Sequence, residues 1–370
     1  MTLPVTLSVY IARQFAGFVF GMLLALSGLV AMFDFIELLR RSISKPDATF
    51  AIVAQIAGLR LPYIAMQVLP FAVLLGGMLC FWRLTRSSEL VVARAAGVSA
   101  WEFLAAPTAC ALLFGLLATT AISPLSSVMF RRAEAMDDIY LKSGGGPLAL
   151  SGGQLWLRQS DRGLAPQGVA IIHAHGVQLR GKRLTATQVS VFRLDDHDKL
   201  LTRIEAGNVW LGPGAWLLQN ARVIRPEQMP EPPTNIALPT DLTVSRVQES
   251  FASPDTLSFW TLPDFIALLD RSGFSSIRHR LHFQALLASP LLCATMALVA
   301  AGFSMRPTRR GGVAQMIGSG VAIGFALFVI SKIAEEFGQT GALPVVLAAW
   351  VPAVSGMMLS VALLLHTEDG

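Results

Sequence analysis

Residues 337–365 read FGQTGALPVVLAAWVPAVSGMMLSVALLL, a run of 29 residues without one charged side chain. Five further charge-free runs precede it, at 15–33, 62–82, 103–130, 283–305 and 311–331. About 20 apolar residues in a helix cross the ~30 Å hydrocarbon layer of a bilayer. The composition agrees, because 53% of the 370 residues are hydrophobic and only 14% are charged. The runs exclude a soluble enzyme and predict six membrane-spanning helices.

The charged residues gather in one stretch, 131–282, which holds 32 of the 53 Lys, Arg, Asp and Glu side chains. That length is enough for a water-soluble domain of its own. We therefore predict an α-helical membrane protein with six transmembrane helices and one domain inserted between helices 3 and 4. The predicted boundaries are 1–130 for helices 1–3, 131–272 for the inserted domain with a return helix, and 273–370 for helices 4–6.

The short loops favour one orientation in the membrane. Six spans place both termini on one side, together with the loops 83–102 and 306–310. The other side holds the connecting segments 34–61 and 332–336 and the inserted domain. Loop 306–310 reads RPTRR and has no acid. Basic residues in short loops mark the cytoplasmic side, while long domains cross largely regardless of charge. We predict cytoplasmic termini and an extracytoplasmic inserted domain.

Cations also gather at the opposite membrane surface, against this bias. An anionic ligand at the outer leaflet is one physical reason for them, and ordinary interfacial snorkelling is the other. Nine cations stand near the outer membrane surface, against seven at the cytoplasmic surface. The nine are Arg40, Arg41, Lys45, Arg60, Arg131, Arg132, Arg278, Arg280 and Lys332.

The inserted domain has short β-type runs separated by turn residues. Gly212-Pro-Gly214 joins 209–211 to 215–218, which predicts a hairpin. Many short strands at such spacing indicate an all-β sandwich or jelly roll. Residues 226–239 hold five prolines, which indicates a loop or an edge segment. Apolar residues return to helical spacing at 262–269, so we expect a short return helix that Gly273 ends.

No constellation in the sequence indicates catalysis or a metal site. His173 and His175 share one face of a strand, but no third and fourth potential ligand lies at a spacing typical of a metal site. Cys80, Cys110 and Cys293 lie in apolar runs, which suits packing. The Gly-x-Ser-x-Gly, His-Glu-x-x-His and Gly-x-x-x-x-Gly-Lys-Ser/Thr patterns are absent. We predict no catalytic residue, no metal site and no bound cofactor, so ATP-driven work would need a separate ATPase.

The cytoplasmic loop 83–102 contains a predicted short helix near 86–98. Ser87 or Ser88 can cap it, Glu89 in its first turn suits the helix dipole, and Gly97 can end it. Its Leu-Val-Val at 90–92 is too apolar for a segment that is exposed to water on all sides. A partner surface or packing at the membrane interface would cover these side chains.

Two spans carry a Gly-x-x-x-Gly pattern, Gly17 to Gly21 and Gly320 to Gly324. Small residues four apart let two helices approach closely in lipid. We expect the first and fifth spans to lie at helix–helix contacts, with a subunit boundary as one place for them. No span carries a charge near its middle, which disfavours an ion-coupled carrier.

Residues 86–99, RSSELVVARAAGVS, resemble the coupling-helix motif of the lipopolysaccharide export permeases of the LptF/LptG family. The resemblance extends to DFIELLRR at 34–41 and to LPFAVLLG at 69–76. The plan of six spans with one insert covers the whole chain. The sequence Glu-Leu-Val-Val at 89–92 and residues 318–332 resemble the LptG branch of the family more than the LptF branch.

The resemblance implies a multi-pass permease subunit of an ABC-type exporter in the bacterial inner membrane, with a β-jellyroll domain in the periplasm. Such a subunit would pair with an LptF-like permease on an LptB-like ATPase dimer. It would extract lipopolysaccharide from the outer leaflet and pass it to LptC-like and LptA-like bridge proteins. ATP and Mg would be used by the ATPase, and no nucleic acid would be bound.

The resemblance also assigns roles to residues. The first and fifth spans would form a lateral gate, in which Gly17, Gly21, Gly320 and Gly324 would pack. Contact with the ATPase would involve Glu89, Leu90, Arg94 and Gly97. Contact with substrate phosphates, which arginine can bind bidentately, would involve Arg40, Arg41, Arg131 and Arg132.

Two positions depart from the family pattern, since Asp34 and Leu286 stand where relatives often carry a cation. Two other interpretations stay open. One is an LptF-type paralogue of the same complex. The other is a non-transporting mechanotransmission protein, which would need an effector contact but no cations at the outer leaflet.

Overall fold

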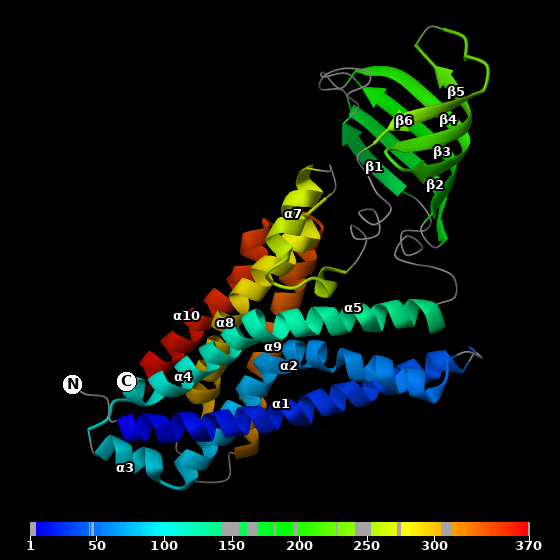
Figure 1. Ribbon diagram of the computed structural model, residues 1–370. Coiled ribbons are helices and arrows are strands. Elements are labelled where there is room, and N and C mark those ends of the chain that lie inside the picture. The colour runs from blue at the N-terminus through cyan, green and yellow to red at the C-terminus, as the bar shows by residue number, and fades with distance from the viewer. Residues whose placement is uncertain are drawn as a thin grey trace. The chain divides into compact units, whose positions relative to one another are not determined.

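A computed structural model describes residues 5–43, 45, 48–95, 97–141, 155–160, 169–180, 183–194, 199–226, 228–240, 253–271, 275–304 and 313–368. The chain divides into two compact units (Figure 1). The helical unit comprises Met1–Met136, Pro254–Pro263 and Ile277–Gly370, and the β unit comprises Asp137–Ser253 and Asp264–Ser276. Each unit is described by itself.

Long helices make up the helical unit. They are α1 (Val5–Ser42), α2 (Phe50–Arg86), α4 (Ala100–Leu117), α5 (Ser123–Tyr140), α8 (Ile277–Ser304), α9 (Val313–Gln339) and α10 (Val345–Glu368), with the short α3 (Glu89–Ala95) between α2 and α4. Five stretches of the described residues are long and apolar enough to cross a membrane: Thr6–Ser42, Phe50–Arg86, Ala100–Tyr140, Ile277–Ser304 and Val345–His366. The predicted fifth span lies in α9, which is not among these five, so six spans stay a prediction.

Several helices continue well past their apolar runs. The 38 residues of α1 extend about 57 Å, almost twice the hydrocarbon thickness. The prediction of a connecting segment over 34–61 is wrong for most of its length, because α1 ends at Ser42 and α2 begins at Phe50. A charged side chain ends the apolar run but not the helix, since the backbone hydrogen bonds continue in water.

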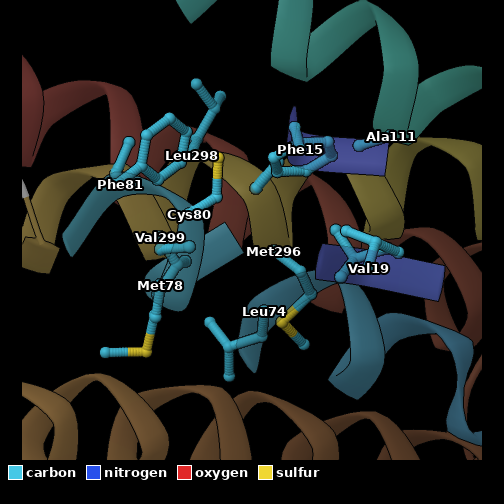
Figure 2. Close-up of a cluster of buried hydrophobic side chains, with 14 of the residues drawn as sticks. Phe15, Val19, Leu74, Met78, Cys80, Phe81, Ala111, Met296, Leu298 and Val299 are labelled. Carbon is cyan, nitrogen blue, oxygen red and sulfur yellow. The ribbon is translucent and has the colours of Figure 1, made fainter. Parts of the chain in front are cut away.

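The core of the helical unit is formed by side chains from α1, α2, α4 and α8 (Figure 2). Phe15 of α1 and Phe81 of α2 are fully buried there, with ring centroids 6.1 Å apart. Cys80 and Cys293 are buried in the same core, and all three cysteines are free. The cysteines therefore act as packing residues.

Glycines set the closest helix contacts in this core. A Cβ at Gly76 of α2 would lie 2.6 Å from the Cα of Val19 in α1. A Cβ at Gly115 of α4 would lie 2.5 Å from the Cα of Pro290 in α8. Because backbone atoms cannot rotate away as a side chain can, a larger residue at either position must separate two helices.

The substitution Gly76→Leu is therefore expected to destabilise the protein by about 1–3 kcal/mol, the usual cost of overpacking. Gly28→Leu on α1 is the matched control, since a Cβ at Gly28 has no neighbour within 4 Å. The thermal midpoints of the two variants in mild detergent measure the difference. Equal midpoints would show that α1 and α2 do not approach as described.

A π-helical turn, η1 (Ala118–Ile122), joins α4 to α5. Pro124 has no N–H to bond the carbonyl of Thr120 four residues earlier. The indole Nε1 of Trp260 donates to that carbonyl instead, at 3.0 Å. The Ser123 hydroxyl accepts the backbone N–H of Phe259 at 3.1 Å. These bonds fix the segment after η2 (Pro254–Thr256) to the helical unit.

The described strands of the β unit form one antiparallel sheet, in the order β1-β2-β3-β4-β5-β6. They are β1 (Leu155–Ser160), β2 (Val169–Arg180), β3 (Arg183–Leu194), β4 (Leu200–Gly212), β5 (Ala215–Ile224) and β6 (Thr234–Pro239). The predicted hairpin is confirmed, since Gly212 pairs with Ala215 and Gly214 has a φ of 74°. The proline-rich stretch supplies the edge strand β6.

The order of these strands differs from the predicted jelly roll. A jelly roll contains Greek-key crossovers, which make non-consecutive strands neighbours. Every neighbour among the described strands is consecutive, so they form a meander. Turn residues and alternation in the sequence mark where strands lie but not which strands pair.

One face of the sheet forms an apolar core. Alternate side chains of β2 to β6 are buried, with Trp216 and Leu184 among the largest. The two edge strands meet at one end through Gln159 of β1. Its Nε2 donates to the Pro239 carbonyl at 3.1 Å, and the Thr240 hydroxyl donates to its Oε1 at 2.8 Å. The sheet therefore curls around its apolar face.

The return helix α7 (Leu262–Arg271) lies where the helical spacing predicts it. Leu262, Phe265 and Leu269 are its buried side chains. The predicted stop at Gly273 lies outside the described residues.

Candidate functional site

The short helix α3 packs against the core of the helical unit through Leu90. Leu90 is only 5% exposed and belongs to the same apolar cluster as Phe103 of α4. Val92, two residues on, is 67% exposed. Leu90 therefore anchors α3 to the bundle, while the Val92 side chain lies at its surface. The side chain of Arg94 lies outside the described residues.

Glu89 opens α3, and its carboxylate is oriented from the preceding helix. The Ser87 hydroxyl lies 2.8 Å from Glu89 Oε1 and donates to it. Ser87 Oγ is also 3.0 Å from the Arg83 carbonyl, which places it at the end of α2. Glu89 stays partly exposed.

Gly97 ends α3 in the predicted manner. Its φ is 86°, a backbone conformation that favours glycine. The N–H of Val98 donates to the carbonyl of Ala93 at 3.1 Å, which is the long bond of a Schellman motif. Ser99 and Glu102 then form a capping box that starts α4, with the Glu102 N–H bonded to Ser99 Oγ at 3.1 Å. Both ends of α3 are therefore fixed by their own hydrogen bonds.

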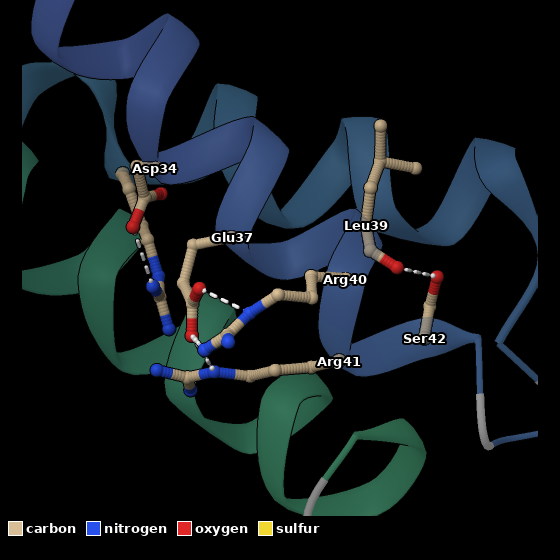
Figure 3. Close-up of polar contacts among 7 residues, drawn as sticks. Asp34, Glu37, Leu39, Arg40, Arg41 and Ser42 are labelled. Carbon is tan, nitrogen blue, oxygen red and sulfur yellow. Dashed lines mark hydrogen bonds and ion pairs between the residues drawn. The ribbon is translucent and has the colours of Figure 1, made fainter.

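At the opposite end of α2 lies a second group of charges, called here the distal cluster: Asp34, Glu37, Arg40, Arg41, Arg60 and Glu134. On the last turns of α1, Glu37 accepts hydrogen bonds from Arg40 Nε at 2.8 Å, Arg40 Nη2 at 2.9 Å and Arg41 Nε at 3.1 Å (Figure 3). The side chains of Arg40 and Arg41 are 75% and 48% exposed. One carboxylate thus gathers two exposed guanidinium groups on one face of α1.

Asp34 belongs to the same cluster and is paired with α2. Arg60 Nη1 lies 3.1 Å from Asp34 Oδ1, and Arg60 Nη2 lies 4.0 Å from Glu134 Oε1 of α5. The Arg60 side chain is only 14% exposed. The expectation that Arg60 lies in a short external segment is wrong, because it stands inside α2 and joins three helices. The acid at position 34 is neutralised by this arginine.

Arg131 and Arg132 lie side by side on α5, and both are exposed. In the described part of the chain, neither guanidinium has an acidic partner. Two free cations therefore stand on α5, close in sequence to Glu134.

The two glycine pairs are placed differently. On α1, a Cβ at Gly17 or Gly21 would meet nothing within 4 Å. On α9, a Cβ at Gly320 would collide with Met78, and one at Gly324 would collide with Leu74, both side chains of α2. The α9 pair therefore serves packing within the chain, and the α1 pair leaves an open surface of small residues.

Comparison with known proteins decides the family. The family described as "Lipopolysaccharide export system permease LptF/LptG" matches residues 9–366. The chain belongs to the LptF/LptG family. It is 24% identical over 363 residues to the lipopolysaccharide export system permease protein LptG of Haemophilus influenzae, covering 94% of this chain and 95% of that protein. It is 25% identical over 356 residues to the protein of the same name from Escherichia coli K12, covering 93% of each chain.

The resemblance drawn from residues 34–41, 69–76 and 86–99 is thereby confirmed, including the likeness to LptG. An LptF/LptG permease is a component of a transporter rather than an enzyme. Among the described residues, no group of three His, Cys, Asp or Glu side chains could hold a metal ion. His173 and His175 have ring centroids 4.4 Å apart, and desolvation and the neighbouring His175 lower the pKa of His173.

Three features of this LptF/LptG permease were not predicted from the sequence. Glu37 binds Arg40 and Arg41, and its spacing of three and four residues from them is a helical signal. The capping box at Ser99 and Glu102 also carries a readable signal, the Ser-x-x-Glu pattern. The pairing of Asp34 with Arg60 has no local signal, since the two residues are 26 positions apart.

Proposed function

We propose that this chain is the LptG-type permease subunit of an ABC-type exporter that extracts lipopolysaccharide from the outer leaflet of the bacterial inner membrane. The observation that carries the proposal is the family match over residues 9–366. The described residues add two supports, the fixed helix α3 at one end of α2 and exposed arginines at the other. An LptF-like permease, an LptB-like ATPase dimer and LptC-like and LptA-like bridge proteins complete the proposed assembly.

The proposed topology has six spans, with α9 as the fifth. The 27 residues of α9 extend about 40 Å, which is enough to cross the hydrocarbon layer. The termini and α3 would be cytoplasmic, and the strands, which lie in the chain between α5 and α8, would be periplasmic. The cations of the distal cluster then stand near the outer leaflet.

In the proposed mechanism, α3 transmits closure of the ATPase dimer to the helices. Because Leu90 is buried among side chains of α2 and α4, a force on α3 moves the core of the unit. ATP and Mg belong to the partner ATPase. Removing lipid chains from the bilayer costs about 0.8 kcal/mol per exposed CH₂ group, so a lipid with several chains needs that work.

Arg40 and Arg41 are the proposed contacts for the phosphates of lipopolysaccharide, with Arg131 and Arg132 as further contacts. The Arg40 guanidinium is held through two of its nitrogens by Glu37, yet its side chain remains 75% exposed. Solvent screens exposed pairs of this kind, so they contribute little to stability. A phosphate, which binds arginine more strongly, can therefore displace Glu37 from these guanidinium groups.

The variant Glu37→Gln should bind lipopolysaccharide more tightly than the wild type, by roughly twofold, because the phosphate no longer has to displace a weakly bound, solvent-screened carboxylate. Equilibrium binding of labelled lipopolysaccharide to the detergent-purified complex measures this. Glu231→Gln, which removes the acid paired with Arg225 on the β unit, is the matched control and should leave affinity unchanged. Weaker binding by Glu37→Gln would contradict the assigned role of the pair.

Reconstitution tests the function itself. The complete complex in liposomes that contain lipopolysaccharide should transfer it to an added LptA-like acceptor, and only when ATP is supplied. Hydrolysis of ATP without any transfer would favour the mechanotransmission alternative.

A further inference from the structure

An open cavity with two arginines in its lining lies at the end of the helical unit that carries α3. Its volume is about 460 Å³. The described residues that line it come from the first turns of α1 and from the last turn of α2: Tyr10, Arg13, Gln14, Gly17, Phe18 and Arg83. It is separate from the distal cluster, which lies at the other end of α1.

The cavity offers hydrogen-bond donors and positive charge. Gln14 Nε2 donates to the Tyr10 hydroxyl oxygen at 2.6 Å, so the Tyr10 O–H remains able to donate. The Arg83 guanidinium lies 5.8 Å from the centroid of the Phe18 ring. None of the described lining residues is acidic, and in the described part of the chain neither Arg13 nor Arg83 has an acidic partner. Two guanidinium groups and a phenol suit a phosphate group.

The position of the two arginines indicates where that phosphate comes from. Arg13 stands two residues before the apolar run 15–33, and Arg83 directly follows the run 62–82. Both therefore stand where hydrocarbon meets water.

Apolar surface continues from the cavity along the same helix. Phe20 and Leu24 are 57% and 59% exposed. Together with Arg13 and Gly17 they follow the i, i+4, i+7, i+11 spacing of one helix face. A lipid whose phosphate lies in the cavity can place its acyl chains along this face.

We propose that this cavity binds the phosphate of an anionic phospholipid from the leaflet on the α3 side of the membrane. The site is additional to the proposed lipopolysaccharide contacts, since it lies at the opposite end of α1 and takes a resident lipid. Retention of this lipid requires neither ATP nor lipopolysaccharide transfer.

The test reconstitutes the full complex in vesicles of phosphatidylglycerol and phosphatidylethanolamine, extracts it in mild detergent and counts retained phosphatidylglycerol by native mass spectrometry. The double variant Arg13→Gln/Arg83→Gln should retain roughly tenfold less, because charge-assisted hydrogen bonds are lost. Arg86→Gln is the matched control, since Arg86 lies over the Trp82 ring at 5.4 Å and does not line the cavity. Equal loss in Arg86→Gln would overturn the site.

A cavity-filling variant and a competition with inorganic phosphate test the same site independently. Gly17→Phe fills the cavity with both arginines in place and should lower retention as the double variant does, which covers the case in which the double variant fails to fold. Inorganic phosphate at millimolar concentration should leave the retained phospholipid in place. Full displacement by inorganic phosphate, or unchanged retention in Gly17→Phe, would overturn the lipid assignment.

Discussion

The charge reversal Glu89→Lys is expected to abolish assembly of this chain with its ATPase while leaving insertion in the membrane intact. Glu89 stands in the first turn of α3, partly exposed, with its carboxylate oriented by the Ser87 hydroxyl at 2.8 Å. Losing one member of a close charge pair at an interface costs about 2–5 kcal/mol, and reversal adds repulsion. Co-purification of the ATPase with the tagged permease measures the loss, and the amount of permease in the membrane fraction measures insertion.

Two further variants test whether the loss is specific to the charge at position 89. Glu336→Lys makes the same change of charge at an exposed position of α9 and should leave co-purification unchanged. Glu89→Gln removes the charge without reversing it and should weaken assembly less. Normal co-purification of the Glu89→Lys variant would show that α3 does not dock through this acid.

The second large effect is expected from the double reversal Arg40→Glu/Arg41→Glu. Each guanidinium can make charge-assisted hydrogen bonds to a phosphate, and the reversal replaces them with repulsion, so lipopolysaccharide transfer should fall by roughly tenfold or more. ATPase assembly should remain, because the substituted residues belong to the distal cluster, which lies at the opposite end of α2 from α3. ATP-dependent transfer of lipopolysaccharide in proteoliposomes is the measurement.

Conservative substitution separates charge from geometry at this site. Arg40→Lys/Arg41→Lys keeps both charges but loses the bidentate fork, so transfer should lie between wild type and the double reversal. Normal transfer by the double reversal, with the ATPase still bound, would contradict the assignment of these residues to substrate.

Much of the helical unit could be predicted from the sequence, because charge-free runs report directly on the hydrocarbon layer. The ends of these runs did not predict where the helices end, since α1 continues through the charged residues Asp34, Glu37 and Arg40. The short helix at 89–95 was readable from Glu89 and Gly97, which act locally. The burial of Leu90 was not readable, because it depends on side chains of α2 and α4 far away in the sequence.

The β unit shows the same division between local and distant information. Strand positions and the Gly212–Ala215 hairpin follow from alternation and turn residues. The pairing order does not, and neither does the bond from Thr240 to Gln159, which spans 81 residues. Likewise, two identical glycine patterns gave no sign that Gly324 would be covered by Leu74 and Gly21 left open.

The most direct measurement is affinity purification of the tagged chain from its native membrane in mild detergent, followed by mass spectrometry of the proteins and lipids that elute with it. The proposed function predicts a second permease of the same family, a nucleotide-binding ATPase and bound lipopolysaccharide. An intact assembly that contains neither an ATPase nor a phosphorylated glycolipid would contradict it.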